Sequence, residues 1–214
     1  AAAMSRQTYA AFTGFALAQA AHRPADSVVL ADGATLAAPA WVRGLRVAFL
    51  LGVAALLVTA VIGGLLRAGV AVPVPADSTW PGQSVLAHAF LIICGFMGTV
   101  IGIERAVAVK ARLAFTAPVA SALAGFAMLA GRPGAAAWLA VVAAFAFVGV
   151  NAVVIERQRA PHTVLLGAGA VAWLVGNLLQ ALGTQSAAVV PWWFSFLVLT
   201  IAAVVGPSLW LCAF

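Results

Sequence analysis

The spacing of one histidine and three small residues predicts that they share a helix face within an apolar stretch of this chain. On an ideal α-helix, Gly95 and Thr99 lie within about 20° of His88, and Gly102 lies within about 40°. An imidazole at the end of a smooth groove could serve as an axial haem ligand or a copper ligand, because small residues leave room for a flat macrocycle. The same residues are also typical of close helix–helix packing. The sequence leaves both interpretations open.

Other soft donors lie near this histidine in the sequence. Cys94 and Met97 are potential copper ligands, but their angular offsets from His88 are about 120° and 180°. A three-residue copper site on this helix alone is therefore not expected, although Met128 could join from another helix. His162 is expected near the opposite membrane face, about 20 Å or more away. The two histidines are not expected to hold one haem together.

Two Glu-Arg pairs each follow an isoleucine and close an apolar stretch. They are Glu104-Arg105 and Glu156-Arg157, and both are expected at the same membrane face. Ion pairs across helices, Glu104 with Arg157 or Arg112 and Glu156 with Arg105, would then tie the helix ends together. We interpret all four residues as structural ion pairs. A proton relay at Glu104 is the alternative, disfavoured because this residue lies at the membrane edge.

The other polar residues within the apolar stretches are few. Asn151 and Asn177 lie well inside two of them and are expected to form interhelical hydrogen bonds. The chain has no phosphate-binding loop, nucleophile elbow, zinc-protease helix or dinucleotide-binding fingerprint. No acid lies in the middle of a stretch, and no polar path is visible. The sequence therefore favours neither an enzyme nor a transporter.

The elements that position these residues follow from composition. Of 214 residues, 65% are hydrophobic and 7% are charged, whereas soluble domains average about 45–50% and about 25%. Six apolar runs, each close to the about 20 residues that span a bilayer as a helix, lie near 44–66, 84–103, 113–131, 135–155, 163–183 and 189–212. We predict an all-α integral membrane bundle of six transmembrane helices arranged as three hairpins.

Charge predicts how this bundle is oriented. The chain has 11 Lys and Arg against 5 Asp and Glu, and most basic residues precede the first run or follow the second and fourth. Only Arg67 and Arg132 belong to the other side. Because basic loops stay in the cytoplasm, both termini are predicted to be cytoplasmic. No basic stripe with interleaved aromatics is present, so nucleic acid is not an expected partner.

The chain divides into two parts by composition. Residues 1–40 are less apolar and are predicted to be a cytoplasmic N-terminal segment, with an interfacial helix that places Tyr9, Phe12 and Ala16 on one side. Within it, residues 28–36 are expected to form a small hairpin that turns at Asp32-Gly33. Residues 41–214 are predicted to be the six-helix transmembrane domain.

Three motifs carry a resemblance to a known group of proteins. They are Gly95-Phe-Met-Gly-Thr-Val-Ile-Gly-Ile-Glu-Arg-Ala-Val-Ala108, Ala172-Trp-Leu-Val-Gly-Asn-Leu-Leu179 and Val190-Pro-Trp-Trp-Phe-Ser-Phe-Leu-Val-Leu-Thr-Ile-Ala202. Over residues 41–202 the chain resembles bacterial multi-pass inner-membrane proteins of unassigned function, which are distantly similar to NnrS proteins. The resemblance implies the bacterial inner (cytoplasmic) membrane. NnrS proteins contain haem and copper and are tied to nitric oxide stress, which implies a metal near His88.

The chain also departs from these groups. The fuller histidine set of NnrS proteins is missing, and the Glu-Arg pair expected after Thr200-Ile-Ala is replaced by Ala203-Val-Val-Gly-Pro. Short loops, few polar groups in the spans and an uncharged last span favour a non-catalytic integral subunit or accessory protein of a larger respiratory or photosynthetic complex. Its expected partners are the lipid bilayer and other membrane subunits. A haem- or copper-binding NnrS-like protein is the alternative, and a small-solute transporter is the weaker one.

Overall fold

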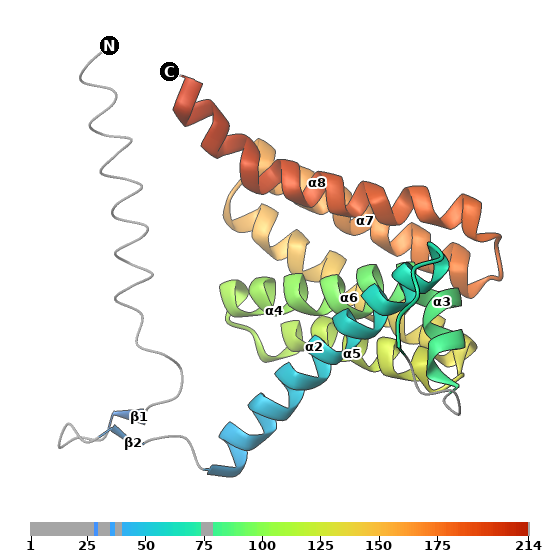
Figure 1. The fold of residues 1–214 in the computed structure, drawn as a ribbon. Helices are drawn as coiled ribbons and strands as arrows, with labels where there is room; N and C mark the ends of the chain where they lie inside the picture. The colour runs from blue at the N-terminus through green and yellow to red at the C-terminus, as the bar shows by residue number, and fades with distance from the viewer. Residues whose placement is uncertain (1–27, 30–34, 37–39, 74–78, 214) are drawn as a thin grey trace, which may run out of the picture. The chain divides into compact units, whose positions relative to one another are not determined.

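Helices account for most of the described chain. The computed structural model describes residues 28–29, 35–36, 40–73 and 79–213, with side chains at 43–73 and 79–205. The chain separates into two units, Ala1–Leu50 and Leu51–Phe214. The helices in chain order (Figure 1) are α2 (Ala40–Arg67), α3 (Trp80–Phe90), the π-helix η1 (Leu91–Met97), α4 (Gly98–Val109), the 3₁₀-helix η2 (Arg112–Phe115), α5 (Thr116–Leu129), α6 (Pro133–Arg157), α7 (Pro161–Ala181) and α8 (Ser186–Ala213).

Six stretches of helix are long and apolar enough to cross a membrane. They are Arg43–Arg67, Trp80–Val109, Arg112–Leu129, Pro133–Arg157, Pro161–Ala181 and Ser186–Val205. All six predicted apolar runs are therefore confirmed as helical. The second of them is built from α3, η1 and α4 in direct succession.

Local sequence explains where these helices begin and end. Proline occupies the first position of α6 and α7, where its missing N–H costs no helical hydrogen bond. Gly69, Gly131 and Gly183 follow α2, α5 and α7 with φ of 81°, 72° and 77°. This left-handed conformation suits glycine, because it has no Cβ. Lys110 adopts it at φ 59° after α4.

Helices α4 to α8 pack in chain order. α4 packs on α5, α5 on α6, α6 on α7 and α7 on α8, and α4 also contacts α6. Alanine lets these helices approach closely, with buried examples on α5 and α6 at Ala117, Ala120, Ala124, Ala136, Ala140, Ala143 and Ala144. The packing of α6 on α7, which belong to two different predicted hairpins, is about as extensive as the packing of α5 on α6 within one hairpin. The division into three hairpins stays a prediction.

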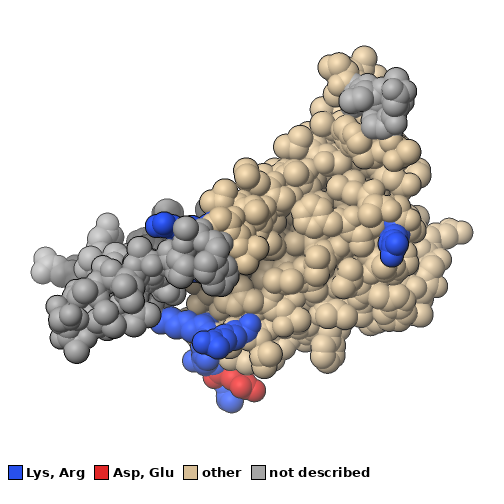
Figure 2. Space-filling model, turned by 90° about the horizontal axis from the view of Figure 1, so that it is seen from below, with Lys and Arg blue, Asp and Glu red and all other residues tan. Residues whose placement is uncertain are grey.

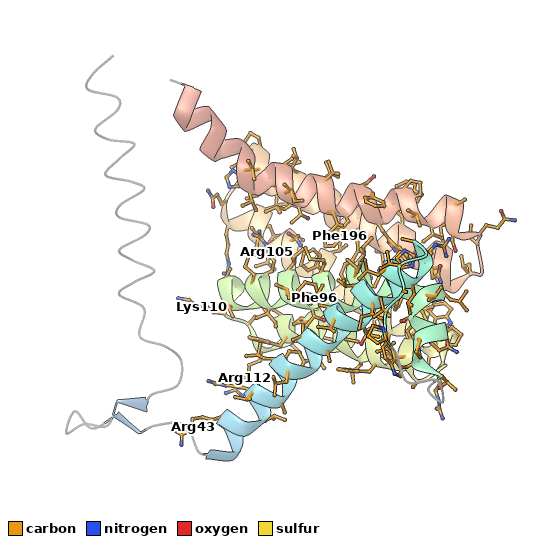
Figure 3. All side chains as sticks on the ribbon, in the orientation of Figure 1. Arg43, Phe96, Arg105, Lys110, Arg112 and Phe196 are labelled. Atoms are coloured by element: carbon orange, nitrogen blue, oxygen red, sulfur yellow. The ribbon has the colours of Figure 1, made fainter. Side chains whose placement is uncertain are left out.

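An aromatic cluster fills the centre of this packing. Trp173 of α7 stacks on Phe196 of α8 with ring centroids 5.0 Å apart. Phe147 of α6 meets both rings edge to face, at centroid distances of 5.6 Å and 5.9 Å. Figure 3 shows Phe196 directed from α8 into the bundle, and all three side chains are buried. Such edge-to-face and offset pairs contribute beyond their buried area.

Residues 51–67 of α2 cross this bundle with very close contacts. Leu56 and Ala60 are fully buried. The backbone at Gly63 lies directly against the backbone of Ser84 in α3, so that a Cβ at Gly63 would collide with the Ser84 carbonyl. Leu56 lies against Gly125 of α5. These contacts explain why glycine stands where the helices cross.

In the N-terminal unit, two short strands pair antiparallel. β1 (Val28–Val29) and β2 (Thr35–Leu36) place Val28 opposite Leu36 and Val29 opposite Thr35. This confirms the strands of the predicted hairpin. Its expected turn at Asp32-Gly33 and the expected interfacial helix at Tyr9, Phe12 and Ala16 lie outside the described residues.

The outward faces of the helices are largely apolar. Figure 2 shows a broad surface without charged side chains, with most Lys and Arg gathered toward one end of the visible face. Large exposed hydrophobic side chains include Val119 and Leu123 of α5, Phe145 of α6, and Phe194 and Val198 of α8. Soluble proteins rarely expose so much apolar area in continuous patches. The architecture is that of a multi-pass membrane protein.

Candidate functional site

The π-helix η1 changes the expected relation between His88 and the small residues. The N–H of Gly98 bonds to the carbonyl of Ile93, five residues back, whereas an α-helix bonds four residues back. One additional residue in the turn rotates everything after it by about 100°. The offsets expected for Gly95, Thr99 and Gly102 assumed an uninterrupted α-helix. The predicted face shared with His88 is therefore wrong for Thr99 and Gly102, which follow the π turn, whereas Gly95 lies inside it.

The π turn is stabilised by a neighbouring helix. Because the Gly98 N–H bonds to Ile93, it is not the donor for the Cys94 carbonyl, and the Ser121 hydroxyl of α5 donates to that carbonyl instead. Gly98 makes room for this contact, since a Cβ there would collide with Ser121 Oγ and with the Trp173 ring. Local π adjustments in membrane helices are tolerated when neighbouring side chains satisfy the freed backbone groups.

The small-residue groove is filled by α5 and α2. A Cβ at Gly102 would lie 3.2 Å from Pro118, and one at Gly95 would lie 3.4 Å from Gly125. Thr99 is fully buried and donates to the Gly95 carbonyl at 2.5 Å. Of the two interpretations left open, the structure supports helix packing for these three residues. A macrocycle does not fit in this groove.

His88 instead lines a cleft at one end of the bundle. The cleft has a volume of about 650 Å³. The His88 Nδ1 lies 3.1 Å from the Val85 carbonyl. Because a carbonyl oxygen only accepts, Nδ1 carries the hydrogen, which leaves Nε2 available in the neutral ring. Gly64 of α2 lies beside the imidazole, where a Cβ would be 3.8 Å from Cδ2.

The other soft donors are divided between two environments. Met128 is buried and lines the same cleft as His88. Cys94 lies in the bundle interior, where its Sγ donates to Asn177 Oδ1 at 3.2 Å. Within the part of the chain that the structure describes, no three His, Cys, Asp or Glu side chains form a group that could hold a metal ion.

The cysteine belongs to a polar network centred on Asn177. Asn177 Oδ1 also accepts a hydrogen bond from Trp193 Nε1 of α8 at 3.1 Å, and its Nδ2 donates to the Ala140 carbonyl of α6 at 3.4 Å. The expected interhelical role of Asn177 is therefore confirmed. The same expectation is wrong for Asn151. Its Nδ2 donates at 2.9 Å to the Phe147 carbonyl in the same helix, and its Oδ1 has no partner among the described residues.

The Glu-Arg residues do not form the expected ion pairs across helices. Glu104 Oε1 lies 3.5 Å from Nη2 of its neighbour Arg105, and no salt bridge joins Glu156 to Arg105 among the described residues. The Arg105 side chain is only 13% exposed, whereas that of Glu104 is 64% exposed. Glu156 is exposed, and Arg105 turns into the bundle, where its Nε has no hydrogen-bond partner.

Arg157 links α6 to α4 in another way. Its Nη1 donates to the Val109 carbonyl at 3.2 Å. The last carbonyls of a helix have no intrahelical partner and carry partial negative charge, so they attract a cation. Figure 3 shows Arg105, Lys110 and Arg112 at this same end of the bundle. Arg157 therefore joins α6 to α4 through a backbone carbonyl and not through the expected ion pair with Glu104.

Sequence reasoning missed the polar residues around the cleft. Arg67, Gln83, Gln180 and Ser186 all line it together with His88, although they belong to α2, α3, α7 and α8. Each lies close to the end of a predicted run, where polar residues are ordinary. The signal in the sequence was their position, since all four lie at or near ends of predicted runs that the charge pattern assigns to the side with few basic residues.

Comparison with known proteins identifies a family. A family model described as a domain of unknown function (DUF8744) matches residues 46–204. Because this match covers most of the chain, the chain belongs to that family. No curated protein and no solved structure matched the chain. Family membership therefore covers the transmembrane bundle and carries no assigned activity.

Proposed function

We propose that this chain is a non-catalytic integral subunit or accessory protein of a larger respiratory or photosynthetic complex in the bacterial inner membrane. The observation that carries the proposal is the closed interior of the bundle, where Asn177 hydrogen bonds with Cys94, Trp193 and the Ala140 carbonyl. Polar groups within a membrane usually serve a pathway or hold helices together. Here they connect helices, which supports a scaffold more than the weaker alternative, a small-solute transporter.

The helices at the two ends of the chain support an assembly role. In the apolar 18-residue windows of the first and last spans only 22% and 28% of the residues are buried, less than in the other four. On α8, Phe194, Val198 and Ile201 are more than half exposed. These faces suit contact with lipid and with other membrane subunits, because α8 carries no charge between Ser186 and Val205.

The proposed orientation places both termini in the cytoplasm, with the spans as three hairpins. A reporter that is active only in the cytoplasm is expected to be active when it is fused after Arg112. A reporter that is active only outside the cytoplasm is expected to be active when it is fused near Ser78. The reason is that Arg105, Lys110 and Arg112 retain their end of the bundle inside. Paired phosphatase and fluorescent-protein fusions at both sites measure this. The reverse activities at both sites would contradict the orientation.

A haem- or copper-binding protein similar to NnrS is the second candidate function. The observation that favours it is the free Nε2 of His88, since metal-binding histidines usually donate their other N–H to a carbonyl or carboxylate. Met128 lines the same cleft, and a His/Met pair is a known haem ligand set. These two residues would hold the group, which would supply redox chemistry or ligand binding at the cleft.

The two candidate functions differ in colour, metal content and particle mass. We expect the full chain, purified from its native membrane in mild detergent, to be colourless, free of iron and copper, and associated with other subunits. A visible spectrum, metal analysis and native mass spectrometry measure these properties.

Single-residue variants decide the metal question. A haem absorption band that is present in the parent and lost in His88→Ala, but retained in His162→Ala, would contradict the structural proposal and establish the second candidate. His162 is a suitable control because it is half-buried at the start of α7 and does not line the cleft. A metal-free particle of a single chain would contradict both candidates.

A further inference from the structure

The cleft beside His88 has a polar rim made by several helices. Gln83 comes from α3, Gln180 from the end of α7 and Ser186 from the start of α8, while Arg67 ends α2. The side-chain amides of Gln83 and Gln180 each carry two N–H donors. Both line the cleft, which has a volume of about 650 Å³. This volume is within the range of about 300–1,000 Å³ that holds a small organic molecule.

The electrostatic character of the rim is positive. Arg67 is the one charged side chain among the described residues that line the cleft, and none of them is acidic. Three helices also begin here, since Gln83 lies in the first turn of α3, Pro133 opens α6 and Ser186 opens α8. Helix N-termini present unpaired N–H groups and partial positive charge. A negatively charged group is favoured at this rim.

The wall beyond the rim is apolar and follows α8. Val190, Trp193, Phe194 and Leu197 line it from α8, and Ile93 lines it from η1. Phe194 is 56% exposed, so the wall continues onto the face of the bundle that hydrocarbon would contact. A molecule bound here would meet hydrogen-bond donors and a cation at one end and aliphatic and aromatic side chains at the other.

We propose that this cleft binds an anionic amphiphile, with its acidic head group at Arg67, Gln83 and Gln180 and its hydrocarbon chain along α8. The arrangement matches a phosphate or carboxylate head joined to an acyl chain. Such a molecule has two sources, an anionic phospholipid of the bilayer or a free fatty acid. This inference goes beyond the proposed subunit role and does not depend on it.

Binding is tested with the full chain, delipidated in detergent and titrated in native mass spectrometry. The probes are phosphatidylglycerol and phosphatidylcholine with identical acyl chains, and oleate. We expect phosphatidylglycerol to bind more tightly than phosphatidylcholine. Arg67→Gln is expected to weaken phosphatidylglycerol binding about tenfold, because it removes a charge-assisted hydrogen bond. It is expected to weaken phosphatidylcholine binding less, because choline already neutralises the phosphate of that lipid.

Two further variants distinguish contacts to the head group of the lipid from contacts to its hydrocarbon chain. Arg132→Gln is the matched control, since Arg132 is an exposed arginine just before α6 that does not line the cleft. It is expected to leave all affinities unchanged. Phe194→Ala is expected to weaken both phospholipids by the same factor, because it removes chain contacts alone. Phe194 is exposed, so its loss leaves folding intact.

The displacement experiment distinguishes the two possible sources of the bound molecule, and other results would overturn the proposal. Oleate that displaces phosphatidylglycerol identifies a fatty-acid site, whereas oleate that fails to displace it identifies a bilayer phospholipid site. Equal affinity for both phospholipids in the parent chain would overturn the proposal. So would equal losses in Arg67→Gln and Arg132→Gln. Haem or copper that depends on His88, without phosphatidylglycerol binding, would also overturn it.

Discussion

Gly63→Ala is expected to lower the free energy of unfolding by about 2–3 kcal/mol. A Cβ at Gly63 would collide with the backbone carbonyl of Ser84 and with its Cβ. Backbone atoms cannot rotate away as the end of a flexible side chain can, so α2 would have to move away from α3. Titration of the full chain with sodium dodecyl sulfate in mixed micelles, followed by circular dichroism, measures the loss.

The next residue supplies the matched control. A Cβ at Gly64 would meet only Cδ2 of His88, at an ordinary contact distance of 3.8 Å. Gly64→Ala is expected to be neutral or to stabilise by up to about 1 kcal/mol, because alanine is the better helix former. Equal destabilisation by the two variants would contradict a close crossing of α2 and α3 at Gly63.

Asn177→Leu is expected to lower the free energy of unfolding by about 2 kcal/mol. Leucine has a similar size, so the main effect is the loss of hydrogen bonds with Cys94, Trp193 and the Ala140 carbonyl. Trp193 Nε1 would remain buried without a partner, whereas the Ala140 carbonyl would keep its hydrogen bond within α6. Single interhelical hydrogen bonds in membranes average only about 0.6 kcal/mol, so the predicted loss depends on three of them failing together.

The second buried asparagine is the control for this prediction. Asn151→Leu is expected to change stability by less than about 0.5 kcal/mol. Asn151 donates to the Phe147 carbonyl of its own helix, and its Oδ1 has no partner among the described residues. The double variant Asn177→Leu/Trp193→Phe measures the coupling between the two residues. Its loss of stability is expected to be smaller than the sum of the losses in the two single variants. Equal losses at both asparagines would rule out the network as a source of stability.

Trp193 connects this network to the cleft. Its Nε1 donates to Asn177, while its ring lines the cleft and meets Phe90 edge to face at 5.8 Å. The interior hydrogen bond therefore holds part of the apolar wall in position. The hydrogen bond between Asn177 and Trp193 therefore contributes to the shape of the cleft.

The helical spans were predictable because membrane crossing depends on summed hydrophobicity along the chain. Proline at the start of α6 and α7, and glycine after α2, α5 and α7, marked the boundaries through local backbone preferences. These signals need no knowledge of neighbouring helices. The predicted helical character of all six runs is confirmed for that reason.

The candidate site was less predictable, because it depends on how far one helix is rotated about its own axis from one residue to the next. The spacing of His88 and Gly95 indicates one face only if every turn has 3.6 residues. The π turn at Leu91–Met97 is accommodated by the Ser121 hydroxyl of α5 and by the space at Gly98. Ser121 belongs to a different span from the turn. Spacing along a single span does not show this.

By itself, the amino-acid sequence determined a chain of six apolar helices with few charges, since composition and turn residues act locally. Only the tertiary structure decided that Gly95, Thr99 and Gly102 pack on other helices while His88 faces a cleft with Arg67, Gln83 and Gln180. It also decided that Arg157 bonds to a carbonyl and that Asn177, and not Asn151, joins helices. These outcomes depend on which side chains meet across helices, and that is set by close packing and by the rotation of each helix about its axis.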